Sequence, residues 1–222
     1  MSFFHTIKGA LLNIVFPMKC VSCGKAGSYF CLPCIADAPV AERESEDWIF
    51  PVFDYRHPPI KKSLWLFKYK NKKALAETFA EVLHGKILEE LFPLFELTNF
   101  RDALLVPIPL SRKRYRERGY NQAELIAKAL VKLDSGLYFK LGQNILIKPK
   151  DTKHQARIKN RSERLKNIVG SFAVSGEWEN KIKGRNIILI DDILTTGATL
   201  TEAKKVLRKS GARKIIAFTV AH

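Results

Sequence analysis

The strongest constraint on the fold is an apolar run that leads into a polar loop containing a glycine. Residues 187–190 read Ile-Ile-Leu-Ile, which is typical of a strand buried on both faces. Asp191 and Asp192 follow at its carboxyl end, where open α/β sheets bind their ligands. The chain then turns into a helix through Thr195, Thr196, Gly197, Ala198 and Thr199. Backbone N–H groups at a helix start carry partial positive charge, so this segment predicts an anion site.

The residue types in this loop suit a sugar phosphate. Ionised carboxylates only accept hydrogen bonds, so two adjacent ones fit the vicinal hydroxyls of a ribose. The threonine hydroxyls add hydrogen bonds to a phosphate, and Gly197 permits close approach of the backbone. The motifs G-x-x-x-x-G-K-[ST] and G-x-G-x-x-G do not occur, which excludes two common nucleotide-binding loops. A strand followed by a capped helix would explain Thr199 but not the acidic pair.

Strands and helices alternate from residue 103 onward. We expect strands at Ala103–Ile108, Asn144–Ile147, Arg185–Ile190 and Lys214–Val220, and helices at Asn121–Leu133 and Thr199–Ser210, the second ending at Gly211. This alternation indicates a parallel sheet flanked by helices in an α/β fold. Upstream we expect a strand at Trp48–Tyr55, a turn at Pro58 and Pro59, and a core-facing helix carrying Leu75, Phe79, Val82, Leu83, Ile87, Leu88 and Leu91.

All four cysteines lie near the N-terminus, as Cys20-x2-Cys23 and Cys31-x2-Cys34. Two such pairs can grip one tetrahedral Zn²⁺, and four thiolates close its coordination sphere, so the predicted metal is structural. Gly24 follows the first pair, where a tight turn helps backbone amides to reach the thiolates. Disulfides are disfavoured in a chain without a secretion signal, and a thioredoxin-like pair would not come doubled.

The length of 222 residues, 46% of them apolar, leaves room for one domain with a small appendage. We expect an N-terminal helix and zinc module over 1–45 and an α/β domain over 46–222. Residues 1–17 show a helical apolar stripe, interpreted as a helix that docks on this protein's own core or on a membrane surface or partner. No transmembrane segment and no A-x-A-like cleavage site is recognised, so we expect a cytoplasmic protein.

The formal charge of +16 is unevenly distributed along the chain. Residues 1–100 carry 12 Lys and Arg against 11 Asp and Glu, whereas residues 101–222 carry 26 against 11. A net positive charge attracts polyanions. The basic half is also the half that contains the predicted anion site, and its surplus exceeds what one small phosphate ligand needs.

These motifs resemble known families. The segment at 187–199 looks like the phosphoribosyl-pyrophosphate fingerprint of type I phosphoribosyltransferases. Residues 106–127, which read VPIPLSRKRYRERGYNQAELIA, are similar to the signature of the ComF competence proteins (the ComFC/GntX branch). Those proteins also carry a four-cysteine zinc module before a phosphoribosyltransferase-like domain. The stretch at 66–70, the basic run at 153–164 and the ending Ala221-His222 fit as well, so the resemblance runs from about Cys20 to the C-terminus.

The resemblance implies roles for particular residues. Asp191 and Asp192 would contact the ribose 2′- and 3′-hydroxyls, and the loop from Thr195 to Thr199 would hold the 5′-phosphate. The loop after the strand at 103–108 would bind pyrophosphate, which points to Ser111 and Arg112. Mg²⁺ would accompany phosphoribosyl pyrophosphate, bridging its hydroxyls and its pyrophosphate oxygens. No residue is identified as a general base.

The remaining basic residues suggest a nucleic acid. Tyr115 and Tyr120 interleave with the arginines that follow Ser111, a mixture that suits base stacking and phosphate contacts. Residues 153–166 predict a surface loop, either a lid over the site or a further nucleic-acid contact. The candidates for nucleic-acid binding are Arg114, Arg116, Arg118, Lys153, Arg157 and Arg161. A solvated basic face is the alternative.

Three functions follow from these features. The first, implied by the resemblance, is a role in natural transformation, with phosphoribosyl pyrophosphate and single-stranded DNA as ligands and the DNA-uptake machinery at the inner membrane as a partner. The second is a metabolic phosphoribosyltransferase that joins a nucleobase or an amine to the phosphoribosyl group. The third is a ligand sensor without turnover, which no helix-turn-helix supports. The sequence leaves open whether the protein is an enzyme.

Overall fold

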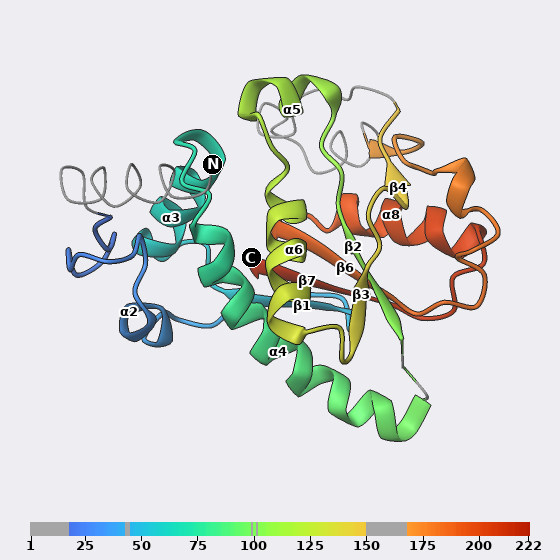
Figure 1. The fold of residues 1–222 in the computed structure, drawn as a ribbon, viewed down its shortest axis with the longest axis horizontal. Coiled ribbons are helices and arrows are strands. Elements are labelled where there is room, and N and C mark those ends of the chain that lie inside the picture. Colours follow the sequence, from blue (N-terminus) through green and yellow to red (C-terminus); the bar gives the residue numbers. More distant parts are fainter. Residues whose placement is uncertain (1–17, 43–44, 99, 101, 150–167) are drawn as a thin grey trace, which may run out of the picture.

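The computed structural model describes residues 18–42, 45–98, 100, 102–149 and 168–222. A five-stranded sheet forms its centre, with the strand order β1 (Ile49–Phe53), β7 (Ile215–Ala221), β6 (Ile187–Ile193), β2 (Ala103–Pro107) and β3 (Phe139–Leu141). Every neighbouring pair is parallel, which confirms the predicted α/β fold (Figure 1). The sheet therefore has one carboxyl edge, at which the ends of β2 and β6 lie beside each other.

The apolar run of β6 is buried on both faces because alternate residues enter two different cores. Ile188 and Ile190 pack with the helices α4 (Leu75–Thr98) and α6 (Gln122–Asp134). Ile187 and Leu189 pack with α8 (Ala198–Lys209) on the opposite face. Successive side chains of a strand point to opposite faces of the sheet, so a central parallel strand that is covered on both faces needs apolar residues at every position.

Most predicted elements are present, with shifted ends. Pro58 and Pro59 do not form a separate turn: they are the first residues of α3 (Pro58–Tyr69), where their missing N–H groups cost no hydrogen bond. The strand β6 does not end before the acidic pair but runs through it to Ile193. The helix α8 begins at Ala198, one residue early, and ends before Gly211, whose φ of 93° fits the predicted stop.

The region between α6 and β6 differs most from the expectation. The edge strand β3 was not predicted, because only three residues form it and one of its side chains is exposed. The predicted strand at Asn144–Ile147 is shorter and lies outside the main sheet. It is β4 (Leu146–Ile147), which pairs antiparallel with β5 (Ala173–Val174). A short 3-10 helix, η2 (Gly176–Trp178), follows.

The cysteine-containing segment packs on the main domain. It contains one short helix, α2 (Leu32–Ala36). Its apolar side chains Phe30 and Ile35 belong to the same core as α4 and α6. Val40 pairs with Phe53 of β1 as an isolated bridge. The boundary at residue 45 stays a prediction, but the two parts share one apolar core.

Two predicted segments, the helix over 1–17 and the loop over 153–166, lie outside the described residues. Among the residues that the structure does describe, no helix is long and apolar enough to cross a membrane.

Candidate functional site

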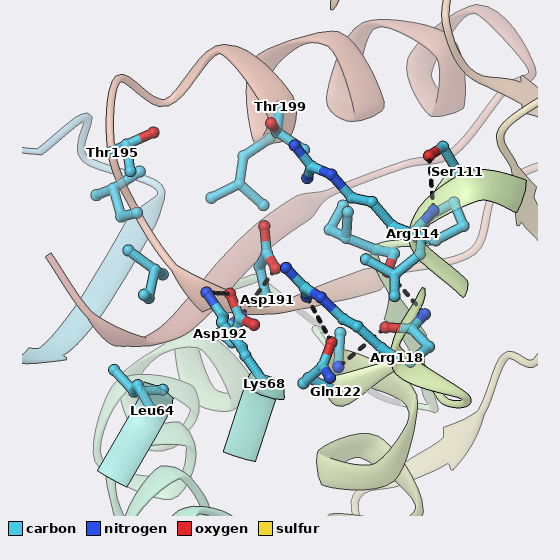
Figure 2. Close-up of a pocket in the computed structure, with 18 of the residues that line it drawn as sticks. Leu64, Lys68, Ser111, Arg114, Arg118, Gln122, Asp191, Asp192, Thr195 and Thr199 are labelled. Carbon is cyan, nitrogen blue, oxygen red and sulfur yellow. Dashed lines mark hydrogen bonds and ion pairs between the residues drawn. The ribbon is translucent and has the colours of Figure 1, made fainter. Parts of the chain in front are cut away.

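A cleft of about 400 Å³ opens at the carboxyl edge of the sheet. Three parts of the chain surround it: α3, the connection from β2 into α5 (Arg112–Arg118) and α6, and the loop from β6 to α8 (Figure 2). This is the edge at which the sequence placed the anion site. Parallel strands bring the ends of β2 and β6 together there, so residues about 80 positions apart in sequence line one cavity.

The loop between β6 and α8 has the geometry of an anion site. Its Gly197 is the N-cap of α8 with a φ of 75°, a left-handed conformation that other residues adopt only at a cost. Thr195, Gly197 and Thr199 line the cleft. Thr196 lines a second cavity on the other side of the same loop, and Ala198 is buried as the first helical residue. The start of the twelve-residue α8 therefore faces the cleft with its positive end.

Asp191 and Asp192 stand next to this loop in different surroundings. Burial and the neighbouring charge of Asp192 raise the pKa of Asp191 to about 7, although the N–H of Asp192, Lys68 and Arg114 act in the opposite direction. Asp192 is 8% exposed, and its Oδ1 lies 2.9 Å from Nζ of Lys68 on α3. The pair thus holds one carboxylate paired with a lysine and one carboxyl that titrates near neutral pH.

The connection from β2 brings positive charge to the opposite wall. Ser111 is the N-cap of α5: its hydroxyl accepts a hydrogen bond from the N–H of Arg114, and it lines the cleft. Arg114 and Arg118, one helical turn apart, both extend from α5 into the cleft, Arg114 toward Thr199 at the start of α8 and Arg118 toward Asp191 (Figure 2). Arg112, the residue expected at the pyrophosphate, is exposed and is absent from the lining of the cleft.

Several lining residues were missed by sequence reasoning, chiefly Trp65, Lys68 and Tyr69 on α3. The net charge of residues 1–100 gave no sign of a basic segment there, because that half is nearly neutral as a whole. Residues 58–73 alone hold six lysines and no acidic residue, and this local count is the signal that could have found them.

The four cysteines converge as predicted, with all sulfur atoms within 4.8 Å of one another. The Sγ atoms of Cys23 and Cys31 are 3.7 Å apart. Ligands about 2.3 Å from a tetrahedral metal ion stand roughly 3.8 Å from each other. The residues therefore fit one tetrahedral metal ion, and the φ of 75° at Gly24 provides the predicted tight turn.

Backbone amides at this cluster favour a thiolate. Burial opposes ionisation of Cys20, but the N–H groups of Cys31, Cys23 and Ser22 outweigh it and lower its pKa to about 6. For Cys31, the N–H of Cys34 lowers the pKa, whereas desolvation and hydrogen bonds with the other sulfurs raise it to about 12. Ionisation of Cys31 would therefore be favoured by a cation among the sulfur atoms.

Comparison with known proteins supports a phosphoribosyltransferase-like domain and a relation to competence proteins. Residues 147–222 match the family described as phosphoribosyl transferase domain. Competence protein F of Haemophilus influenzae is 29% identical over 201 residues, covering 88% of this chain and 81% of that protein. Competence protein ComFC of Streptococcus pneumoniae is 36% identical over 137 residues, covering 60% of this chain and 56% of its own length. DNA utilization protein YhgH of Escherichia coli K12 is 25% identical over 204 residues, covering 88% and 80%.

Over most of its length the chain is similar to the ComF competence proteins. The resemblance drawn from the cysteine pairs, the basic segment and the acidic loop is confirmed, and so is the phosphoribosyltransferase-like fold. This chain spans little more than half the length of the ComFC relative from Streptococcus pneumoniae.

The residues predicted to bind nucleic acid differ in their position relative to the cleft. Arg114 and Arg118 line the cleft, whereas Arg116 is exposed and is absent from the cleft lining. Lys153, Arg157 and Arg161 lie outside the described residues.

Of the two tyrosines expected to stack on bases, only Tyr115 is exposed. Tyr120 is 6% exposed, and its hydroxyl donates a hydrogen bond to the carbonyl oxygen of Phe67. The expectation of base stacking is therefore wrong for Tyr120. Its position among arginines in the sequence suggested a surface residue. In the structure it follows the end of α5 at Gly119 and packs in the core that α3 and α6 share.

Proposed function

We propose that this protein is a ComF-type protein that acts in DNA uptake during natural transformation, binding phosphoribosyl pyrophosphate in the cleft and single-stranded DNA on the basic surface around it. The observation that carries the proposal is the joining of an acidic pair, a helix N-terminus and two arginines in one cavity. Names of relatives that speak of competence and DNA utilization support the cellular role. The cytosol, where thiols stay reduced, is the proposed place of action, next to uptake machinery at the inner membrane.

The proposed ligand would span the cleft from one wall to the other. The 5′-phosphate would accept hydrogen bonds from the loop of Thr195, Thr196, Gly197, Ala198 and Thr199. Asp191 and Asp192 would accept from the ribose hydroxyls, and Asp192 would then exchange Lys68 for the sugar or share it. The pyrophosphate would lie beside Ser111, with Arg114 and Arg118 as its nearest cations in the cleft and Arg112 at the N-terminal end of α5, outside the cleft lining.

Two metal ions complete the proposal. Mg²⁺ bound with the ligand would neutralise pyrophosphate oxygens next to the acidic pair. Zn²⁺ would take Cys20, Cys23, Cys31 and Cys34 in a closed structural site.

Turnover is the second candidate function. The matched domain family and the Asp191 carboxyl, with a pKa of about 7, are compatible with transfer of the phosphoribosyl group to a nucleobase or an amine. Displacement at C1 would release pyrophosphate, which the two cleft arginines would stabilise. Release of pyrophosphate from phosphoribosyl pyrophosphate in the presence of a nucleobase, lost in Asp192→Asn, would favour this function.

The purified protein tests the proposal directly. Calorimetry should detect binding of phosphoribosyl pyrophosphate with Mg²⁺, weakened at least about tenfold in Asp191→Asn/Asp192→Asn, a change that replaces both carboxyl groups by neutral amides. Anisotropy of a labelled single-stranded oligonucleotide should show affinity that falls steeply with salt, because several phosphates release counterions. Glu177→Gln, an exposed acid away from the cleft, is the control and should leave both affinities unchanged. Absence of either ligand's binding would contradict the proposal.

A further inference from the structure

Two large aromatic side chains stand exposed at the cleft. Trp65 and Tyr69, one turn apart on α3, are 47% and 53% exposed, and their ring centroids are 6.4 Å apart. Both line the cleft, and Lys68 between them reaches Asp192. Single exposed apolar residues are ordinary on protein surfaces. Two neighbouring exposed rings at the edge of the cleft are suited to bind a ligand with flat aromatic faces.

A cation lies over each of these rings. Nζ of Lys70 is 5.2 Å from the centre of the Trp65 ring, and Cζ of Arg118 is 5.3 Å from that of Tyr69. These contacts hold the rings in place and put positive charge beside them. Lys70 directly follows α3 and Arg118 belongs to α5, so the arrangement depends on the tertiary fold and was not visible in either segment's sequence.

The surrounding surface is complementary to a phosphate backbone. The stretch 58–73, which contains both rings, holds six lysines and no acidic residue. Of these, Lys61, Lys62, Lys70 and Lys73 are exposed. Aromatic rings interleaved with exposed cations are the combination by which proteins hold single strands, the rings taking bases and the cations taking phosphates.

We propose that Trp65 and Tyr69 form a stacking platform for bases of single-stranded DNA at the mouth of the sugar-phosphate cleft. The proposal rests on the DNA-binding part of the proposed function and adds the surface that contacts the bases. Double-stranded DNA keeps its base faces stacked inside the duplex, so the platform selects a single strand. It also places the strand next to the cleft, sharing Arg118 with the sugar-phosphate ligand.

The test compares a thymidine strand with an abasic strand of equal length, which keeps the phosphates but offers no rings. The wild-type protein should prefer the thymidine strand. Trp65→Ala and Tyr69→Ala should each weaken binding of that strand by roughly 5- to 100-fold, the range that loss of one stacked base produces. Their affinity for the abasic strand and the salt dependence should not change, because no phosphate contact is removed.

Matched variants separate stacking from other effects. Trp65→Phe keeps a ring and should keep most of the preference. Phe92→Ala removes an aromatic side chain of α4 that is 56% exposed and outside the cleft lining, and it should behave as wild type. If Trp65→Ala/Tyr69→Ala still prefers the thymidine strand, the proposed platform is overturned. This holds even if the variants unfold at a lower temperature, because the rings would then contribute to packing alone.

Two further outcomes have distinct meanings. Wild-type protein that binds neither strand overturns the DNA part of the proposed function, and the platform with it. Variants that lose binding of free thymidine monophosphate but bind both strands as wild type does assign the rings to a small ligand, and this also overturns the platform.

Discussion

At the scale of single residues, the acidic pair shows how different neighbours give two chemically identical carboxyl groups different properties. Asp192 finds Lys68 at 2.9 Å, whereas Asp191 is desolvated beside another acid and its pKa rises to about 7. The sequence identified both carboxylates, because they follow a buried strand. It could not identify Lys68, which approaches from a helix more than 120 positions earlier.

The raised pKa of Asp191 predicts a definite pH dependence of stability. Between about pH 4 and 7 the folded protein holds a proton that the unfolded chain releases, so this group's contribution to stability is lost as pH rises through the window. Asp191→Asn should therefore raise the free energy of unfolding at pH 8 and change it little at pH 4, as measured by urea titration. Glu177→Gln is the exposed control. An equal effect of Asp191→Asn at both pH values would contradict the assignment.

Tyr120 makes a buried hydrogen bond, although the basic residues around it in the sequence suggest an exposed position. Tyr120→Phe should lower the free energy of unfolding by about 1 kcal/mol, because the carbonyl of Phe67 loses its partner inside the core. Tyr115→Phe, at the exposed tyrosine five residues earlier, should be neutral. Equal stability of the two variants in denaturant titrations would argue against the buried contact.

At the scale of elements, the central strand and its following helix were predicted within a few residues, since four apolar residues and a glycine leave few alternatives. The edge strand β3 and the true extent of α3 were not, because a three-residue strand has no periodicity and prolines at a helix start resemble those of a turn. The orientation of α5 also depends on tertiary context: its sequence shows four arginines, but only packing decides that Arg114 and Arg118 face the cleft.

Replacement of glycine by alanine should have opposite effects on stability in the loop before α8 and in the interior of α4. Gly197→Ala should cost about 1–2 kcal/mol, because its φ of 75° is left-handed, although an added Cβ would make only ordinary van der Waals contacts. Gly85→Ala lies in the interior of α4 without positive φ and should stabilise by about 0.5–1 kcal/mol. Thermal unfolding of the two variants checks the signs, and a stabilised Gly197→Ala would show that the loop adopts another conformation.

At the scale of the whole molecule, the cysteine segment and the α/β domain share one apolar core. Removal of the proposed metal with a strong chelator should therefore lower the unfolding temperature of the entire chain by several degrees, in a single transition. Cys34→Ser should give the same shift without a chelator. Two separate transitions, with the second unchanged by chelation, would show that residues 1–45 fold as an independent unit.

The measurement that tests the central claim most directly compares ribose 5-phosphate with 2-deoxyribose 5-phosphate on the purified protein. If the acidic pair reads vicinal hydroxyls beside the phosphate loop, the ribose compound should bind at least about tenfold more tightly, because its 2-hydroxyl donates to a buried carboxylate. Asp191→Asn/Asp192→Asn should abolish that preference. Equal affinity of the two sugars for the wild-type protein would contradict the assignment of the cleft.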